Sequence, residues 1–117
     1  MVMLTIAVDF DGVIHTYEKG YHDGTIYGGV IPGTIEALTA LMQRGAEIVI
    51  HTARDLHDLN NVRGWLLAND VPFTRIHEGR GKPIATIYID DRALRFEGCW
   101  VTTMSKVNEI LSRPWPN

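Results

Sequence analysis

Near the start of the chain, a short apolar run ends in two acidic residues. Residues 4–8 (LTIAV) favour β-structure and are followed directly by Asp9, Phe10, Asp11 and Gly12. A run of this length bounded by a glycine is typical of a buried strand. Two carboxylates one residue apart disfavour each other unless a cation lies between them. We therefore expect the end of this strand to serve chemistry rather than packing.

A second acidic pair repeats the arrangement late in the chain. Asp90 and Asp91 directly follow the apolar run 86–89 (TIYI). Two acidic strand ends in one small domain favour a single site that holds a hard divalent cation, since such cations prefer oxygen ligands.

Strand-like and helix-like segments alternate along the chain, which predicts a parallel sheet covered by helices. We expect a doubly wound, Rossmann-like three-layer α/β fold with about five strands, formed by residues 1–117 as a single domain without a cap. The expected strands are 3–9, 46–51, 71–76, 86–90 and a brief fifth at 99–101, with 71–76 near an edge because of Pro72. The expected helices begin at Pro32, with Gly45 as the stop, then run from Leu56 to a cap at Asn69, and lastly over 104–112. Pro114 prevents the last helix from continuing, so the tail either packs on the body or stays loose.

Residues 12–31 are polar and rich in glycine, with tyrosines at 17, 21 and 27. We interpret this segment as a small flap beside the carboxyl end of the first strand. Whether its tyrosines stack on a base or sugar, or pack within the flap, stays open, as does any contact of His15 and His22 with a substrate.

Composition excludes several classes of function. A net charge of -3 and a pI near 5.9 argue against tight nucleic-acid binding through phosphate electrostatics. Cys99 is the single cysteine, so no internal disulfide can form and a reducing compartment fits. The first residues lack a signal-peptide pattern, and no apolar segment approaches the roughly 18 residues of a membrane span. A cytoplasmic location is the expectation.

In a doubly wound sheet, ligands bind outside the carboxyl ends of the strands. The residues expected there, including one lysine in a loop that leads into a strand, are Asp9, Asp11, Thr52, Lys82, Asp90 and Asp91.

These residues form four signatures, in order, that resemble the haloacid dehalogenase superfamily of phosphohydrolases. The similarity covers roughly residues 3–95 and is greatest to small bacterial and phage members without a cap. It implies that Asp9 is the nucleophile that forms an aspartyl-phosphate. It implies that Asp11 protonates the leaving oxygen and later accepts a proton from water. An aspartate at this second position is used for phosphate esters, not by dehalogenases or phosphonatases.

The resemblance also implies a magnesium ion. Its ligands would be the Asp9 carboxylate, the Asp11 backbone carbonyl and Asp90, with Asp91 binding through water or orienting another ligand. Thr52 would hydrogen-bond a phosphoryl oxygen. Lys82 would offset negative charge on the nucleophile and on the transferring group.

Two arginines lie beside these signatures. For Arg54 two interpretations stay open: it binds a substrate phosphate, or it pairs with Asp55 or Asp58. Arg92 is expected to form an ion pair with an acidic neighbour.

The sequence thus predicts a magnesium-dependent phosphomonoesterase with an open site. Its substrate is a small phosphorylated molecule or a polymer end, preferably a nucleotide or a nucleic-acid terminal phosphate. A homodimer that closes the site is possible, but no feature demands it. One alternative is a receiver-like phospho-acceptor, which the absence of an aspartate after the third strand disfavours. The other is a superfamily member that binds without hydrolysis.

Overall fold

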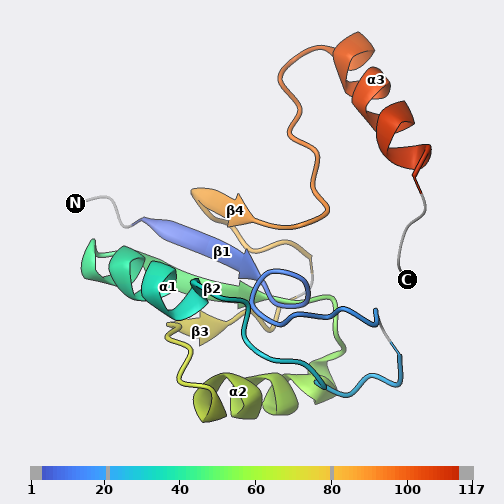
Figure 1. Ribbon diagram of the computed structural model, residues 1–117. Coiled ribbons are helices and arrows are strands. Elements are labelled where there is room, and N and C mark those ends of the chain that lie inside the picture. The colour runs from blue at the N-terminus through green and yellow to red at the C-terminus, as the bar shows by residue number, and fades with distance from the viewer. Residues whose placement is uncertain (1–3, 21, 80, 114–117) are drawn as a thin grey trace.

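The computed structural model describes residues 4–20, 22–79 and 81–113. The described part is an α/β fold built on one parallel sheet, whose strand order is β3-β2-β1-β4 (Figure 1). Its strands are β1 (Thr5–Asp9), β2 (Glu47–His51), β3 (Arg75–Ile76) and β4 (Ile87–Ile89). Its helices are α1 (Thr34–Gln43), α2 (Leu59–Ala68) and α3 (Trp100–Leu111), with a short 3-10 turn, η1 (Leu56–Asp58), before α2.

The central strands β1 and β2 carry the core. They pair in parallel with Ile6 beside Ile48 and Val8 beside Ile50, so these four side chains point to one face of the sheet. The same hydrophobic cluster includes Leu38 of α1 and the α2 residues Leu59, Val62 and Leu66. Both helices therefore cover this one face.

Several local predictions are confirmed. The cap of α2 is Asn69, and Gly45, just past α1, has the positive φ of 89° that glycine adopts without strain. Strand β3 lies at an edge, and it is shorter than the predicted 71–76. Its pairing is limited because Pro72 has no N–H, and the Thr74 N–H is the first in this segment to bond to β2, at Ile48.

The predicted fifth strand is wrong. Residues 99–101 instead begin α3: the Cys99 carbonyl accepts hydrogen bonds from the Thr103 N–H (3.1 Å) and from the Thr103 hydroxyl (2.8 Å). This first helical turn overrides the β-preference of Trp100 and Val101. The described sheet therefore has four strands, and the last helix starts earlier than the predicted residue 104.

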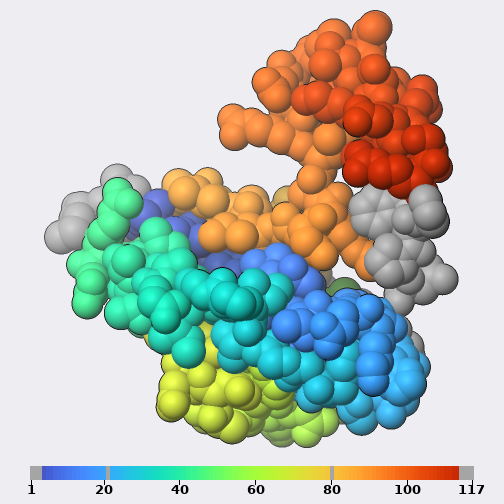
Figure 2. Space-filling view, in the orientation of Figure 1, coloured from blue at the N-terminus to red at the C-terminus, as the bar shows by residue number. Residues whose placement is uncertain are grey.

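Helix α3 stands apart from the sheet, at the end of the chain that follows β4 (Figure 1). None of its residues is buried, and in the space-filling view it forms a separate lobe with the segment before it (Figure 2). Within the described residues, no helix covers the second face of the sheet, so the doubly wound layering that we expected is not part of this arrangement. None of the described helices is long and apolar enough to cross a membrane. The expectations for the tail and for Tyr21 concern residues outside the described ranges.

The flap folds back on itself next to the end of β1. His15 bridges both Asp11 and Val30, and Ile31 donates a backbone hydrogen bond to Ile14 (2.8 Å). The segment thereby forms a narrow ribbon that holds its own side chains against the strand end.

Candidate active site

Three carboxylates meet at the carboxyl ends of two neighbouring strands. Asp9 ends β1 and Asp90 follows β4, and the two strands are parallel neighbours with Val8 beside Ile89. One carboxylate oxygen from each of Asp9, Asp90 and Asp91 lies within 4.8 Å of the others. All three donors are oxygens, which suits a hard divalent cation. The topology thus brings together two acidic motifs, of which Asp9 and Asp90 are 81 residues apart in the chain.

The crowding of negative charge acts most strongly on Asp9. Burial and the nearby Asp90 carboxylate raise the pKa of Asp9 from 3.8 to about 7, and Asp91 and Asp11 add to the rise. The Phe10 N–H donates to Oδ1 of Asp9 (2.9 Å) and opposes it. Without a cation, Asp9 therefore holds a proton up to near neutral pH.

Local turns fix the other two carboxylates. Oδ1 of Asp90 accepts the backbone N–H groups of Arg92 (2.6 Å) and Ala93 (3.2 Å). The Asp91 carboxylate packs directly on Gly12, where an added Cβ would overlap it. Gly12 also has a φ of 87°, so both its backbone and its lack of a side chain are required here.

Asp11 lines the same cavity as Asp9, but its carboxylate is held by other partners. Arg54 donates from Nε to Oδ2 (2.8 Å) and from Nη2 to Oδ1 (3.0 Å), while Nη1 donates to the flap carbonyl of Gly24 (2.6 Å). The Asp11 contact raises the pKa of Arg54. The predicted ion pair of Arg54 with Asp55 or Asp58 is not formed. Arg54 pairs instead with Asp11, which lies 43 residues away in the chain. Binding of a substrate phosphate by Arg54 stays a prediction.

The contact of His15 with Asp11 was not predicted from the sequence, which left open only whether His15 touches a substrate. It is fully buried, and the Gly28 N–H donates to its Nε2 (2.8 Å). That bond leaves the proton on Nδ1, which donates to Oδ1 of Asp11 (2.9 Å). A Cβ at Gly28 would overlap Thr16 and crowd His15. No spacing in the sequence signals this contact, because it depends on the fold of the flap.

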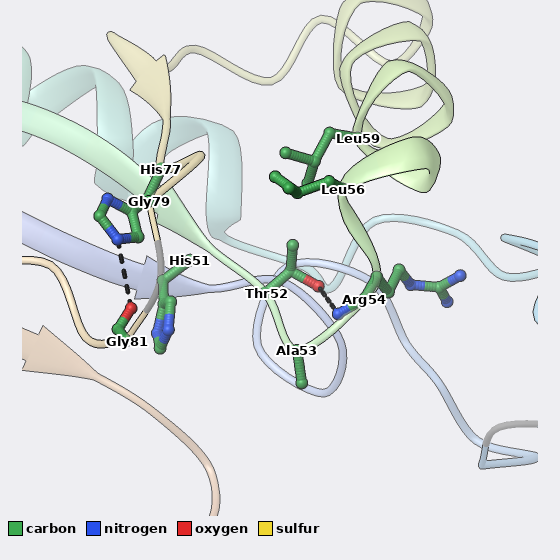
Figure 3. A pocket seen from close by; sticks show the side chains of 9 residues that line it. All are labelled: His51, Thr52, Ala53, Arg54, Leu56, Leu59, His77, Gly79 and Gly81. Atoms are coloured by element: carbon green, nitrogen blue, oxygen red, sulfur yellow. Dashed lines mark hydrogen bonds between the residues drawn. The ribbon is translucent and has the colours of Figure 1, made fainter.

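Thr52 lines a cavity that adjoins the one with Asp9, and both cavities have Ala53 in their walls. Its Oγ1 accepts the Arg54 N–H (3.1 Å), and it lines a cavity of about 260 Å³ with His51 and His77 (Figure 3). The close view shows the Arg54 side chain extending away from both histidines. Burial, followed by His77, lowers the pKa of His51. The expected contact of Thr52 with a phosphoryl group at Asp9 stays a prediction.

Lys82 contacts an aromatic ring, and its expected role beside the nucleophile stays a prediction. Its Nζ lies 3.9 Å from the ring centroid of Tyr88, over the aromatic face. Among the described residues it forms no ion pair with a carboxylate, Asp9 included. Arg92 likewise forms no ion pair within the described residues, so the ion pair that we expected for it is not found there.

Comparison with known proteins adds little to this geometry. No protein-family model matches the chain, and no curated protein matches it. Among solved structures, it is similar to a conserved protein from Bacteroides thetaiotaomicron, with 28% identity over 93% of each chain and a TM-score of 0.62. The similarity supports the overall fold and brings no activity with it.

Proposed function

We propose that this chain is a magnesium-dependent phosphohydrolase of the haloacid dehalogenase type, in which Asp9 is the nucleophile. The observation that carries the proposal is the cluster of Asp9, Asp90 and Asp91 oxygens within 4.8 Å at the carboxyl edge of the sheet. A structural role explains this cluster poorly, because it places mutually repelling carboxylates together and raises the pKa of Asp9 to about 7.

The residues fit a magnesium ion. Asp9, Asp90 and Asp91 supply carboxylate oxygens, and two of the three side chains are exposed, which leaves room for water ligands. When bound, the cation supplies positive charge that keeps Asp9 ionised and offsets the negative charge of a phosphate.

Two carboxylates of the chain divide the chemistry. An ionised Asp9 oxygen attacks phosphorus, the bond from phosphorus to the ester oxygen breaks, and Asp11 donates a proton to that oxygen. Water then attacks the aspartyl-phosphate and passes a proton to Asp11, which regenerates the Asp9 carboxylate and releases phosphate. Both carboxylates line one cavity of about 220 Å³, which supports their joint action.

Arg54 connects this sequence of steps to the substrate. Both Asp11 oxygens accept hydrogen bonds from Arg54, so neither oxygen is free to approach a leaving group while this pair is intact. A phosphate is a strong competitor for a guanidinium group. Transfer of Arg54 from Asp11 to the substrate would therefore both bind the phosphate and free Asp11 to act as an acid.

A second candidate function is binding of a phosphorylated ligand without hydrolysis. Two observations favour it: Lys82 contacts Tyr88 rather than Asp9, and Asp11 is held by Arg54 and His15. We rank it lower because the acidic cluster itself is complete.

The test is phosphate release from an aryl phosphate by the full chain, with and without Mg²⁺. We expect release that depends on the metal, and a loss of about 10³-fold or more in Asp9→Asn, because the nucleophile is removed. Asp70→Asn is the matched control: Asp70 is exposed and lies after α2 with a φ of 57°, a conformation that asparagine tolerates.

Full activity of Asp9→Asn would show that the nucleophile is assigned wrongly. Magnesium binding without release from a broad panel of phosphate esters would favour the non-hydrolytic alternative.

A further inference from the structure

His15 contacts the carboxylate of Asp11 from within the flap. The His15 side chain is 0% exposed, whereas the Asp11 side chain is 17% exposed and lines the cavity that also contains Asp9. A side chain without exposed surface cannot touch a substrate in that cavity. His15 can therefore act on the reaction only through Asp11.

The ring of His15 is held in a single orientation. At Nε2 it accepts the Gly28 N–H (2.8 Å), so its proton is on Nδ1. The His15 carbonyl accepts the Gly12 N–H (2.8 Å), which fixes the backbone that carries the ring. Four aromatic rings pack against it at centroid distances between 5.2 and 6.0 Å, those of Phe10, Tyr17, Tyr27 and Trp65. The Nδ1–H group is thus a preorganised donor to Asp11.

The two oxygens of Asp11 have different partners. Oδ1 accepts hydrogen bonds from Nδ1 of His15 (2.9 Å) and from Nη2 of Arg54 (3.0 Å). Oδ2 accepts from Nε of Arg54 (2.8 Å), and no second partner for it is found in the described part of the chain. When Arg54 transfers to a substrate phosphate, Oδ1 therefore keeps the bond from His15, whereas Oδ2 is left without a partner.

We propose that His15 is a positioning residue that selects Oδ2 of Asp11 as the oxygen that gives its proton to the leaving group. The inference rests on the proposed function, whose acid step it assigns to a single atom. A carboxyl group that had lost both bonds from Arg54 would be free to rotate about its last torsion. The bond from the buried ring opposes this rotation and keeps Oδ1 on the side of His15. Held geometry of this kind makes a proton transfer efficient.

The proton balance of the step follows from this assignment. Oδ2 of Asp11 donates its proton to the ester oxygen, which takes the electron pair of the breaking P–O bond. Asp11 is then a carboxylate whose Oδ1 still accepts from His15. In the second step, the same Oδ2 accepts a proton from the attacking water, which restores the starting form. His15 keeps its proton on Nδ1 throughout, because Nε2 is occupied by the Gly28 N–H.

Two substitutions of His15 separate the two hydrogen bonds of its ring. In His15→Asn, the side-chain amide nitrogen takes the place of Nδ1 and still donates to Asp11. In His15→Gln, the amide oxygen takes the place of Nε2 and still accepts the Gly28 N–H, but the donor to Asp11 is lost. Both variants remove the same ring from the same aromatic surroundings, so their melting temperatures should fall by similar amounts. The pair therefore separates positioning from packing.

The experiment measures kcat/KM of the full chain with Mg²⁺ for phenyl phosphate and for 4-nitrophenyl phosphate. The nitro group stabilises the departing phenolate, so this ester needs less help from an acid than phenyl phosphate does. In His15→Gln, kcat/KM for phenyl phosphate should fall about tenfold or more, since general acid catalysis contributes about 10²–10⁴-fold. The value for 4-nitrophenyl phosphate should change by less than about threefold, because the acid contributes little there. His15→Asn should leave the ratio of the two esters unchanged.

His57→Gln is the matched control, because His57 is exposed in η1. It should leave kcat/KM unchanged for both esters. A loss in His15→Gln that is selective for phenyl phosphate, and that His15→Asn does not show, supports the inference. Equal losses for both esters, an unchanged ratio in His15→Gln, or a selective loss in His15→Asn would mean that His15 acts through packing, and would overturn it.

A second measurement applies if the His15 variants do not fold, or if the unaltered chain hydrolyses neither ester and the proposed function fails. It follows the His15 Nδ1–H signal by proton NMR in Arg54→Met, which keeps an unbranched side chain and removes the donors. The signal should stay at its position in the unaltered chain, because His15 alone then holds Asp11. Asp11→Ala removes the acceptor and gives the position without this bond. A signal in Arg54→Met at that second position overturns the inference.

Discussion

The two strands that flank β1 are similar in sequence and very different in environment. In β2, Ile48, Val49 and Ile50 are each 0% exposed. In β4, Ile87, Tyr88 and Ile89 are 46%, 39% and 37% exposed. Both strands are short apolar runs that pair with β1 in parallel. The difference arises from what covers them and not from the strands themselves.

Helices cover the apolar side chains of β2, whereas no described helix covers those of β4. Helices α1 and α2 contribute buried leucines and a valine to the cluster around β2. Helix α3, which follows β4, buries none of its residues and leaves Trp100 and Phe96 exposed. The comparison shows that an apolar run specifies a strand, whereas the burial of that strand depends on helices elsewhere in the chain.

Strand β4, which is less buried than β2, is the one followed by the two carboxylates of the acidic cluster. The turn after β4 carries Asp90 and Asp91, while β2 ends at His51 and is followed by Thr52, and these two residues line a separate cavity. We therefore assign β2 mainly to stability and β4 mainly to the electrostatics of Asp9.

The largest effect on stability should come from a matched pair of substitutions in the two strands. Ile50→Ala removes a fully buried side chain and should lower the free energy of unfolding by about 3–4 kcal/mol. Ile89→Ala, at a side chain that is 37% exposed, should cost about 1–2 kcal/mol. Urea unfolding followed by circular dichroism measures both.

Equal losses in the two variants would break the comparison. They would mean that β4 is covered in solution as completely as β2, and the position of α3 would then have to differ from the one described.

Local sequence patterns were sufficient to predict much of this fold. The strands β1, β2 and β4, the edge position of β3 and the glycine after α1 follow from short-range chemistry: apolar runs, a proline without an N–H, and a positive φ. Because parallel strands place their carboxyl ends together, the acidic cluster of Asp9, Asp90 and Asp91 could also be predicted from its position.

Contacts that depend on tertiary structure could not be predicted. The partner of Arg54 is Asp11 rather than a residue on its own helix, and His15 is fixed by Gly28 across the flap ribbon. The position of Lys82 over Tyr88 is likewise set by the loop before β4. No periodicity records such contacts, because the residues belong to segments whose packing decides which side chains meet.

The next effect in size concerns pH and sharpens the assignment of β4 to electrostatics. The pKa of Asp9 is raised from 3.8 to about 7, so between these values the folded, metal-free protein binds a proton that the unfolded chain does not. The contribution of Asp9 to the free energy of unfolding is therefore complete below about pH 4 and is lost as pH rises to about 7.

Asp90→Asn should reduce this pH dependence, since Asp90 is the largest of the charges that raise the Asp9 pKa. Carbon-13 NMR titration of the Asp9 carboxyl, without metal, would show a lower pKa in the variant. Asp70→Asn serves again as the exposed control and should leave the Asp9 titration in place. An Asp9 pKa that stays near 7 in Asp90→Asn would mean that burial, Asp91 and Asp11 are sufficient to raise it, and would remove Asp90 from the account.

The smallest effect is expected in α3, and its sign decides whether that helix is covered. Val101 is 82% exposed, and alanine has the higher helix propensity, so Val101→Ala should leave the free energy of unfolding unchanged or raise it by up to about 0.5 kcal/mol. The same substitution at the buried Val62 of α2 should be clearly destabilising, which gives a matched contrast between the two helices. If Val101→Ala instead lowers stability by about 1 kcal/mol or more, α3 buries this side chain in solution. The exposed face of β4 would then be the surface to test as its partner.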